Sequence, residues 1–379
     1  MNATSFTERS ARHCEEAIWL LPITLMSIGL FALAQAAALF FDISPLSMLA
    51  HYGVKALHSL PPILAMTILY MAFLAIRESP QAPITAFLLR ATTILNERWI
   101  IAARIAPLLL MPVVFVSFSS LKMLIPQFVP FWLDDTFAAM DRVLFFGHQP
   151  WEVTHAVFGS IPATIFIDRA YSMWVLLLSV SIVLFALFAP RPDRARFFMA
   201  FTLAWVLLGF GGAWLLVSAG PCYSASIGAE SAPQFAGLVS RLGEISDATG
   251  GGINAWNWQK ILWRSHSTQS YSFGMGISAM PSLHNAIAAL YVLSAFRIGR
   301  MLGWFMTAYA AVIFIGSVHL GWHYAVDGIV GVAAMVLIWR WVDHWCRQSG
   351  YDAAVSSAAK EPGQVHVAVF SADDEQRVH

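Results

Sequence analysis

Long apolar runs recur along the chain, and they constrain its fold more than any other feature. A helix that crosses a bilayer needs roughly 17–25 mostly apolar residues, and we read eight such runs in the sequence. They cover Ala17–Phe41, Leu60–Ile76, Ile105–Ile125, Ala170–Ala189, Phe197–Ala219, Pro281–Phe296, Met301–Val318 and Trp322–Trp341. The sequence therefore predicts an all-α fold, a polytopic membrane helical bundle with about eight transmembrane helices.

The balance of residue types agrees with this prediction. Of the 379 residues, 58% are hydrophobic and 12% are charged, whereas a soluble domain carries about 25% charged residues. The apolar runs are too dense for a pair of soluble domains, although the length would hold two. The formal net charge is zero, so no nucleic-acid partner is expected.

The positions of the arginines predict the orientation of the chain. With the N-terminus inside, the inner segments carry most of the arginines, and the short outer segments carry only Lys55 and Arg142. The positive-inside rule then places both termini in the cytoplasm. The first apolar run, of about 25 residues, exceeds the roughly 7–15 of a signal-peptide core, so we expect it to be retained.

The rest of the chain predicts three regions. Apolar patches within Pro126–Asp168 are broken by Pro, Asp and Gly, which indicates interfacial or re-entrant structure. We expect N-terminal spans and this interfacial region over 1–160, a membrane core over 161–345 and a disordered polar tail over 346–379. Three distant cysteines, at 14, 222 and 346, predict neither a disulfide framework nor a zinc site.

Three polar segments lie at the outer ends of predicted spans. Gly276–Asn285 leads into the sixth span, Gly316–Gly328 joins the seventh to the eighth, and Ser218–Tyr223 ends the fifth. Ionisable residues at membrane depth are costly and usually functional. Because the three segments converge at one depth on the extracytoplasmic face, we predict a site there.

The residue types in these segments suit phosphoryl transfer. His323 and Asp327 are four residues apart, so on a helix the carboxylate can hold one imidazole nitrogen and leave the other as a nucleophile or base. Pro281 is suited to begin a helix, and Ser282 with the free N–H groups of that first turn would attract phosphate. His284, in the same turn, is placed to give a proton to a leaving oxygen.

A metal site is the alternative for the histidines. His319, with His323 and Asp327, supplies ligand types, but no HExxH or paired-carboxylate pattern accompanies them. We therefore expect no metal and no other cofactor.

These segments resemble the type 2 phosphatidic acid phosphatase superfamily of membrane lipid phosphatases and phosphotransferases. That family has a Pro-Ser-x-His motif, matched by Pro281, Ser282 and His284, and a later motif ending His-x-x-x-Asp, matched by His323 and Asp327. The run Ala-Met-Pro-Ser-Leu-His, with Gly-Pro-x-Tyr after the preceding span, is most similar to the inositolphosphotransferase (inositol phosphorylceramide synthase-like) branch.

The resemblance implies a six-helix phosphatase-like core and a metal-free mechanism. His323 would attack phosphorus and form a phosphohistidine, and Asp327 would orient it. His284 would protonate the departing alcohol and then deprotonate the acceptor. The upstream residues Asp134, Asp141, Asp168, Tyr171 and Trp174 are also similar to a pattern in that branch, with a stabilising network as the alternative to a site.

The chain lacks two phosphate-binding cations of the family pattern. Gly220-Pro221 stands where the family has Lys-x6-Arg-Pro, and Ser317 stands six residues before the nucleophile, where it has an arginine. The expected phosphate- or substrate-binding residues are Ser282, Pro281, His319, Ser317, Tyr223, Arg264, Lys260 and Arg241. The last three could instead be solvated loop charges.

The predicted function is that of a membrane-embedded lipid phosphotransferase. It would move a phosphate-linked head group, for example of phosphoinositol type, between lipid and alcohol. The alternative is a lipid phosphate or polyprenyl diphosphate phosphatase on the same site, and a transporter or scaffold is less favoured. The expected partners are a phospholipid or lipid phosphate and an alcohol such as inositol, and the sequence carries no signal for an oligomeric state. The long loop Gly220–Ala279 is read as a lid or an interfacial anchor.

Overall fold

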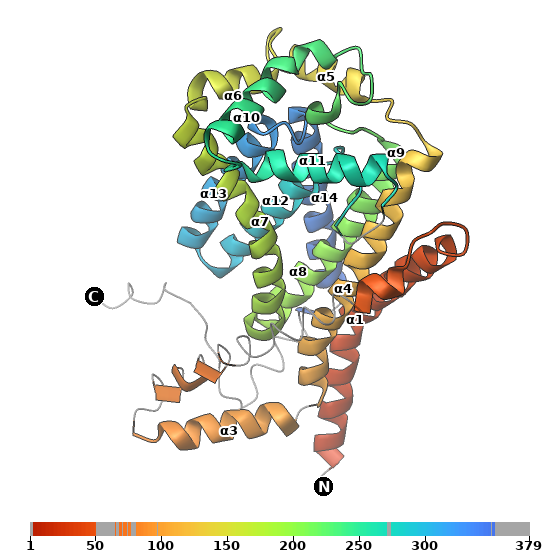
Figure 1. Ribbon diagram of the computed structural model, residues 1–379. Helices are drawn as coiled ribbons and strands as arrows, with labels where there is room; N and C mark the ends of the chain where they lie inside the picture. Colours follow the sequence, from red (N-terminus) through yellow and green to blue (C-terminus); the bar gives the residue numbers. More distant parts are fainter. Residues whose placement is uncertain are drawn as a thin grey trace.

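The computed structural model describes residues 3–50, 81–96, 98–270, 274–349 and 351–352, with a few further positions between 65 and 76. Over these residues the chain is helical and contains no strand (Figure 1). The prediction of an all-α fold is therefore confirmed.

Six helices in the described part of the chain are long and apolar enough to cross a membrane. They are α1 (Ala3–Ala37), α4 (Arg98–Phe128), α7 (Ile161–Phe188), the continuous helix Arg191–Leu215 that begins with α8 (Arg191–Leu203), α13 (Arg300–His319) and α14 (Ala325–Gln348). The predicted span Pro281–Phe296 is a shorter helix, α12 (Leu283–Ile298). The predicted span Leu60–Ile76 falls largely outside the described residues, so the count of eight stays a prediction.

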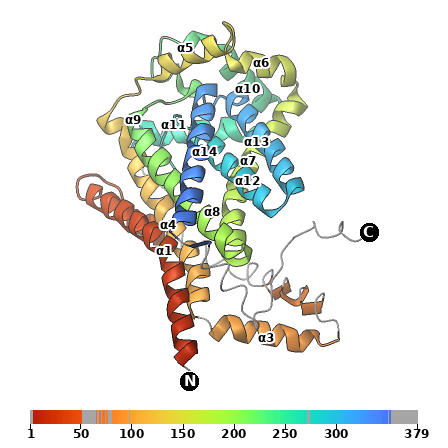
Figure 2. The same ribbon diagram turned by 180° about the vertical axis from the view of Figure 1, so that it is seen from behind.

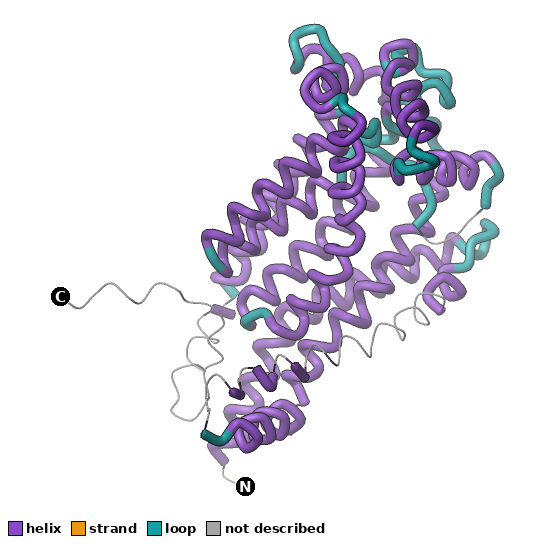
Figure 3. The backbone as a smooth tube through the Cα atoms, turned by 60° about the vertical axis from the view of Figure 1, so that its left-hand side comes forward, coloured by secondary structure: helices purple, strands orange, loops and turns teal. Residues whose placement is uncertain are grey.

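The long helices lie side by side in one bundle, as the views from behind and from the side show (Figures 2 and 3). α12 packs against α13, α14 and α8, α7 packs against α13 and α4, and α1 packs against α4 and α8. The short helix α3 (Pro83–Asn96) contacts α4 and lies toward the end where the N-terminus is drawn. Because α12 is enclosed by neighbours, its first turns are buried.

The helix that begins with α8 changes to a π-helix, η1 (Ala204–Gly212), before it ends in α9 (Ala213–Leu215). A Cβ at Gly212 would lie 2.7 Å from the Pro281 ring, and one at Gly209 would lie 3.0 Å from Leu283. The two glycines therefore let the segment before α12 lie directly against this helix. Widened turns of this kind are frequent at functional sites.

Four short helices cover the end of the bundle opposite the N-terminus. They are α5 (Asp134–Leu144), α6 (Pro150–Phe158), α10 (Ala236–Ala248) and α11 (Asn254–Ser267), and α11 crosses the ends of the spanning helices (Figure 1). We call these four helices the cap. The long loop of the sequence analysis thus contains two helices of the cap, α10 and α11.

The helix boundaries around the cap differ from the predicted interfacial segment Pro126–Asp168. α4 continues through Pro126 to Phe128, and α7 begins at Ile161, so Asp168 lies within a spanning helix. The Ser160 hydroxyl caps α7 by accepting a hydrogen bond from the Ala163 amide. The buried Asp168 is tolerated there because its carboxylate accepts hydrogen bonds from the backbone amides of Asn254 and Ala255.

At the other end of the bundle, ion pairs join α8 to α14 and to the residues that follow it. The buried Arg196 guanidinium lies 2.8 Å from Asp343 and binds both carboxylate oxygens of Asp352, at 2.9 and 2.6 Å. The buried Tyr351 donates a hydrogen bond to the Arg191 carbonyl. The first part of the predicted tail is therefore ordered, and the positions after 352 lie outside the described residues.

Candidate active site

The starts of α12 and α14 meet beneath the cap. Ser282 is the N-cap of α12, and its hydroxyl accepts a hydrogen bond from the Asn285 amide. Asp327 lies in the first turn of α14, and its Oδ2 accepts a hydrogen bond from the amide of the N-cap residue Tyr324 at 3.0 Å. The Ser282 amide donates to the Asp327 carbonyl at 3.1 Å, so the two polar segments of the sequence are joined through their backbones.

His323 and Asp327 lie together, but not on one helix as their spacing predicts, because His323 precedes Tyr324, the N-cap of α14. His323 Nδ1 lies 3.4 Å from Asp327 Oδ2, longer than an ordinary N–H···O hydrogen bond. His323 is 7% exposed and Asp327 is fully buried. Neither His323 Nδ1 nor the other carboxylate oxygen, Asp327 Oδ1, has a hydrogen-bond partner among the described residues.

His284 faces the same space from α12. Its ring lies between Tyr171 and Trp174 of α7, at centroid distances of 4.9 and 4.2 Å. Its centroid is 5.7 Å from that of His323. Tyr171 and Trp174, which the family resemblance also included, therefore pack directly against the His284 imidazole.

A buried hydrogen-bond network links these elements to α13. The Asn285 side-chain amide donates to the hydroxyls of Ser282 and Ser317, at 3.0 and 3.2 Å. The Ser317 hydroxyl in turn donates to the Phe314 carbonyl. Ser317 therefore helps to pack α12 against α13 and has no hydrogen-bonding hydrogen left for a ligand.

Three aspartates each bind two backbone amides of another segment. Asp134 accepts from Ala219 and Gly220 and also from the Tyr324 hydroxyl, while Asp168 binds the start of α11. Asp141 accepts from the two residues that begin α14, Ala325 and Val326. The stabilising network that was the alternative for these residues is thus present in the structure.

Burial raises the pKa of the two buried aspartates of α5. It raises the pKa of Asp141 to about 7, although the two amide hydrogen bonds act in the opposite direction. Burial also raises the pKa of Asp134. A carboxylate at a helix N-terminus is favourable because the N–H groups point toward it.

His319 and Tyr223 lie beside the site but have other partners. The His319 Nε2 is 3.0 Å from the Thr164 hydroxyl, and its ring lies tilted against that of His155, with 4.1 Å between the centroids. The Tyr223 hydroxyl donates to the Gln259 carbonyl, and its ring stacks on Trp263. Among the described residues, no group of three or more His, Cys, Asp or Glu side chains is arranged to hold a metal ion.

The three loop cations of the sequence analysis lie on the cap. Arg241 donates to the Gly159 carbonyl and lies 3.6 Å from Glu244. Lys260 is exposed, with its ammonium 5.3 Å from the Trp256 ring, and Arg264 is exposed as well. No hydrogen bond or ion pair of the described structure joins any of the three to His323 or His284.

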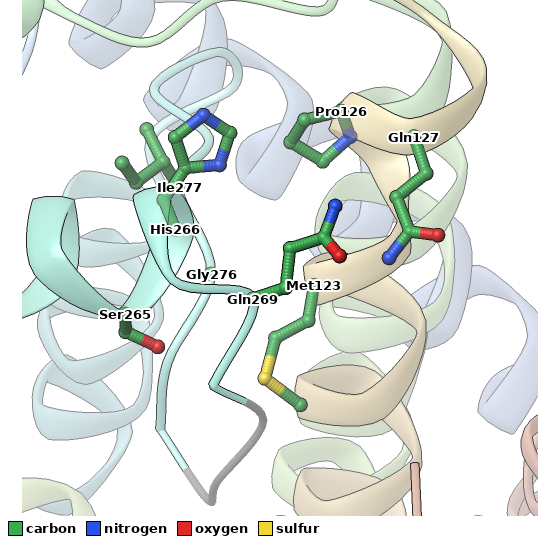
Figure 4. Close-up of a pocket in the computed structure, with 8 residues that line it drawn as sticks. All are labelled: Met123, Pro126, Gln127, Ser265, His266, Gln269, Gly276 and Ile277. Carbon is green, nitrogen blue, oxygen red and sulfur yellow. The ribbon is translucent and has the colours of Figure 1, made fainter. Parts of the chain in front are cut away.

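Two hollows lie at the cap end of the described structure. The smaller one, of about 10 Å³, is lined in part by His323 and Asp141. The larger one, of about 100 Å³, lies between the end of α4 and the segment that follows α11, and neither His284 nor His323 lines it (Figure 4). Its polar lining consists of uncharged groups, which come from Gln127, Ser265, His266 and Gln269.

Lys122 on α4 is a further residue near the site that the motifs did not include. Its ammonium lies 5.6 Å from the centroid of Phe118, which meets Leu283, the neighbour of His284, at Gly209. The available signal was a single lysine inside the apolar run Ile105–Ile125, since a charge in a span is a functional hypothesis by default.

A comparison with known families agrees with this geometry. A family model described as the PAP2 superfamily matches residues 135–341, which is more than half of the chain. The matched range starts in α5 and ends in α14, so it contains His284, His323 and Asp327. No curated protein and no solved structure gives a significant match.

Proposed function

Because the chain belongs to the PAP2 superfamily, which comprises phosphatases and phosphotransferases, we propose that it is a lipid phosphotransferase that works through a phosphohistidine. The observation that carries the proposal is the pairing of His323 with Asp327 opposite His284. A nucleophile, its orienting carboxylate and a proton carrier are the groups that a two-step displacement needs.

In the first step, Nε2 of His323 attacks phosphorus and the bond from phosphorus to the lipid oxygen breaks. Asp327 faces Nδ1 and so keeps the lone pair on Nε2. His284 gives its proton to the departing oxygen, which leaves as an alcohol. In the second step, the acceptor hydroxyl attacks the phosphohistidine while His284 takes its proton, and the phosphorus–nitrogen bond breaks.

The first turn of α12 supplies part of the phosphate site. The amides of the first residues of a helix have no intrahelical acceptor, and in α12 one of them, from Asn285, is taken by the Ser282 hydroxyl. The amides of Leu283 and His284 point toward the same end of the helix and suit the oxygens of a phosphate.

The larger hollow supports an alcohol acceptor. Its amide, hydroxyl and imidazole groups can hydrogen-bond to several hydroxyls, and its lining contains no charged side chain. Such a lining suits a neutral polyol, of which inositol is one. On this basis we propose that the phosphate-linked group of the lipid is transferred to such an alcohol.

Hydrolysis on the same site is the second candidate, and the smaller hollow favours it. A cavity of about 10 Å³ beside His323 matches the roughly 10–15 Å³ that one water molecule requires. A water there would make the protein a lipid phosphate or polyprenyl diphosphate phosphatase.

We also propose that the cap faces the extracytoplasmic side and that both termini are cytoplasmic, from the arginine bias of the sequence. An Asp247→Cys variant tests this, because the residue is exposed at the end of α10. A membrane-impermeant thiol reagent added to intact cells should label the variant and not the parent chain. Labelling only after the cytoplasmic side is opened would reverse the orientation.

The function is tested with purified protein in liposomes that contain phospholipid labelled in its phosphate. Water-soluble labelled phosphate and labelled inositol phosphate ester are followed with and without inositol, and an alkaline quench preserves phosphohistidine. An inositol phosphate ester that forms only with inositol and disappears in His323→Ala and His284→Ala establishes transfer. Phosphate release without inositol establishes the phosphatase instead, and turnover that survives in His323→Ala refutes the phosphohistidine.

A further inference from the structure

Lys122 is a cation without an anionic partner inside an apolar helix. It lies on α4 between the buried residues Leu121 and Met123. Its only ring contact in the described structure is with Phe118, whose centroid is 5.6 Å from the ammonium. No carboxylate among the described residues forms an ion pair with it. An unpaired charge in a membrane span is costly and is usually retained for a ligand or a pathway.

The packing of α4 places this cation beside the candidate active site. Phe118, one turn before Lys122, lies 3.0 Å from the Cβ position of Gly209, and Leu283 lies 3.0 Å from the same point. Leu283 directly precedes His284, and the Lys122 ammonium lies 5.6 Å from the centroid of the same Phe118 ring. α4 and the first turn of α12 are therefore joined across one glycine, on the side of α4 where the ammonium lies.

A second contact fixes the same part of α4. The segment that leads into Pro281 and Ser282 crosses α4 at Gly276, where a Cβ would lie 3.3 Å from the carbonyl carbon of Lys122. The backbone of Lys122 is thus held against the segment that leads into the first turn of α12.

We propose that Lys122 is a phosphate-binding residue that contacts the non-bridging oxygens of a lipid phosphate bound between His284 and His323. This inference rests on the proposed function and deepens it. A phosphate anion would supply the ammonium with the anionic partner that it lacks among the described residues. A fixed cation in a site that excludes water also stabilises the charge that develops on those oxygens during transfer.

The two positions at which the family pattern has a phosphate-binding cation, Gly220-Pro221 and Ser317, cannot take this role here. Gly220 has a φ of +103° and a Cβ there would lie 2.6 Å from the Trp322 carbonyl oxygen, so a side chain does not fit. Ser317 is engaged with Asn285. Lys122 also lies outside the matched range 135–341, so the cation comes from a helix that the family model does not cover.

The test compares Lys122→Met and Lys122→Arg with the wild-type protein. Methionine keeps the length of the side chain and removes the charge, and we expect a fall in kcat/KM for the lipid phosphate of about 100-fold or more. The inhibition constant of orthovanadate, a phosphate mimic, should rise by a similar factor, whereas Lys122→Arg should recover part of both. The matched control is Arg142→Met, which removes an exposed cation of the cap and should change neither value.

Thermal melting separates this role from a structural one. Because Lys122→Met removes an unpaired charge, its melting temperature should equal or exceed that of the wild type. The vanadate constant does not depend on the fraction of folded protein, so it decides the question for any variant that still turns over. Values of kcat/KM and of the vanadate constant within about threefold of wild type would overturn the proposal, since a lost charge-assisted contact costs more than this. A wild-type protein that moves no phosphate would instead refute the proposed function.

Discussion

The backbone amide of Ser282 donates a hydrogen bond to the backbone carbonyl of Asp327, with an N···O distance of 3.1 Å. This contact sets the separation of the two helices that carry His284 and His323. α12 and α14 can approach so closely because Gly331, one turn after Asp327, has no side chain. A Cβ at Gly331 would lie 2.5 Å from the Ser282 carbonyl oxygen.

We therefore predict that Gly331→Ala separates the two histidines. The expected cost in stability is about 1–3 kcal/mol, as for other overpacked cores, and activity should fall by more than the loss of folded protein explains. Thermal melting and kcat on monodisperse protein measure the two effects. Gly29→Ala is the control, because nothing lies within 4 Å of its Cβ position. A Gly331→Ala protein with wild-type melting and kcat would show that this contact does not set the geometry.

The second prediction concerns the orienting carboxylate. Asp327→Asn keeps the shape of the side chain but removes the charge that fixes the tautomer of His323. We expect kcat to fall by about 10²- to 10⁴-fold, the range for a positioned acid–base group, with a smaller change in KM. Asp247→Asn, an exposed position on α10, is the control. An Asp327→Asn enzyme with normal kcat would mean that another group orients His323.

Much of the fold and of the candidate site could be predicted from local sequence. The apolar runs predicted the spans because bilayer thickness fixes the length of a helix that crosses it. The spacing of His323 and Asp327 predicted that they lie close together, although the turn before α14, and not a helical turn between them, brings them within 3.4 Å. These inferences require no knowledge of how distant segments meet.

The features that the sequence did not predict depend on contacts between segments that are distant along the chain. Asp141 binds the start of α14, 184 positions further along the chain, and a lone aspartate carries no sign of its partner. Phe118, one turn before Lys122, and Leu283, the neighbour of His284, meet where Gly209 has no side chain, and nothing in the sequence near Lys122 shows this. The start of α7 was placed too late because Asp168, a charge in isolation, is satisfied by α11.

The third prediction concerns pH. The pKa of Asp141 is raised in the fold to about 7, so the folded protein holds this proton more tightly than the unfolded chain. The stabilisation is complete below the ordinary aspartate pKa, near 4, and is lost as pH rises to about 7, by at most about 1.4 kcal/mol per pH unit. Above that range the contribution is constant.

An Asp141→Asn variant should remove this dependence, because asparagine has the hydrogen-bonding pattern of the neutral acid. Melting temperatures measured between pH 4.5 and 8.5 should fall with pH more steeply in the wild type than in the variant. The control is Asp247→Asn, which should keep the wild-type slope. Parallel curves for the wild type and Asp141→Asn would show that Asp141 does not titrate in this range.

The last prediction tests whether the larger hollow binds the alcohol acceptor or the donor lipid. His266 lines the larger hollow, and its ring packs against Phe131 and Trp263 at centroid distances of 5.7 and 5.1 Å. Burial lowers its pKa, so near neutral pH it is an uncharged hydrogen-bonding group. His266→Phe keeps the ring and removes the nitrogens. If the hollow binds a polyol acceptor, KM for inositol should rise by about 5- to 10-fold, the equivalent of one lost hydrogen bond, while phosphohistidine formation from the lipid stays unchanged. His148→Phe, an exposed histidine of the cap, should alter neither. An unchanged KM would place the acceptor elsewhere, and slower phosphohistidine formation would assign the hollow to the donor lipid, because that step precedes the acceptor.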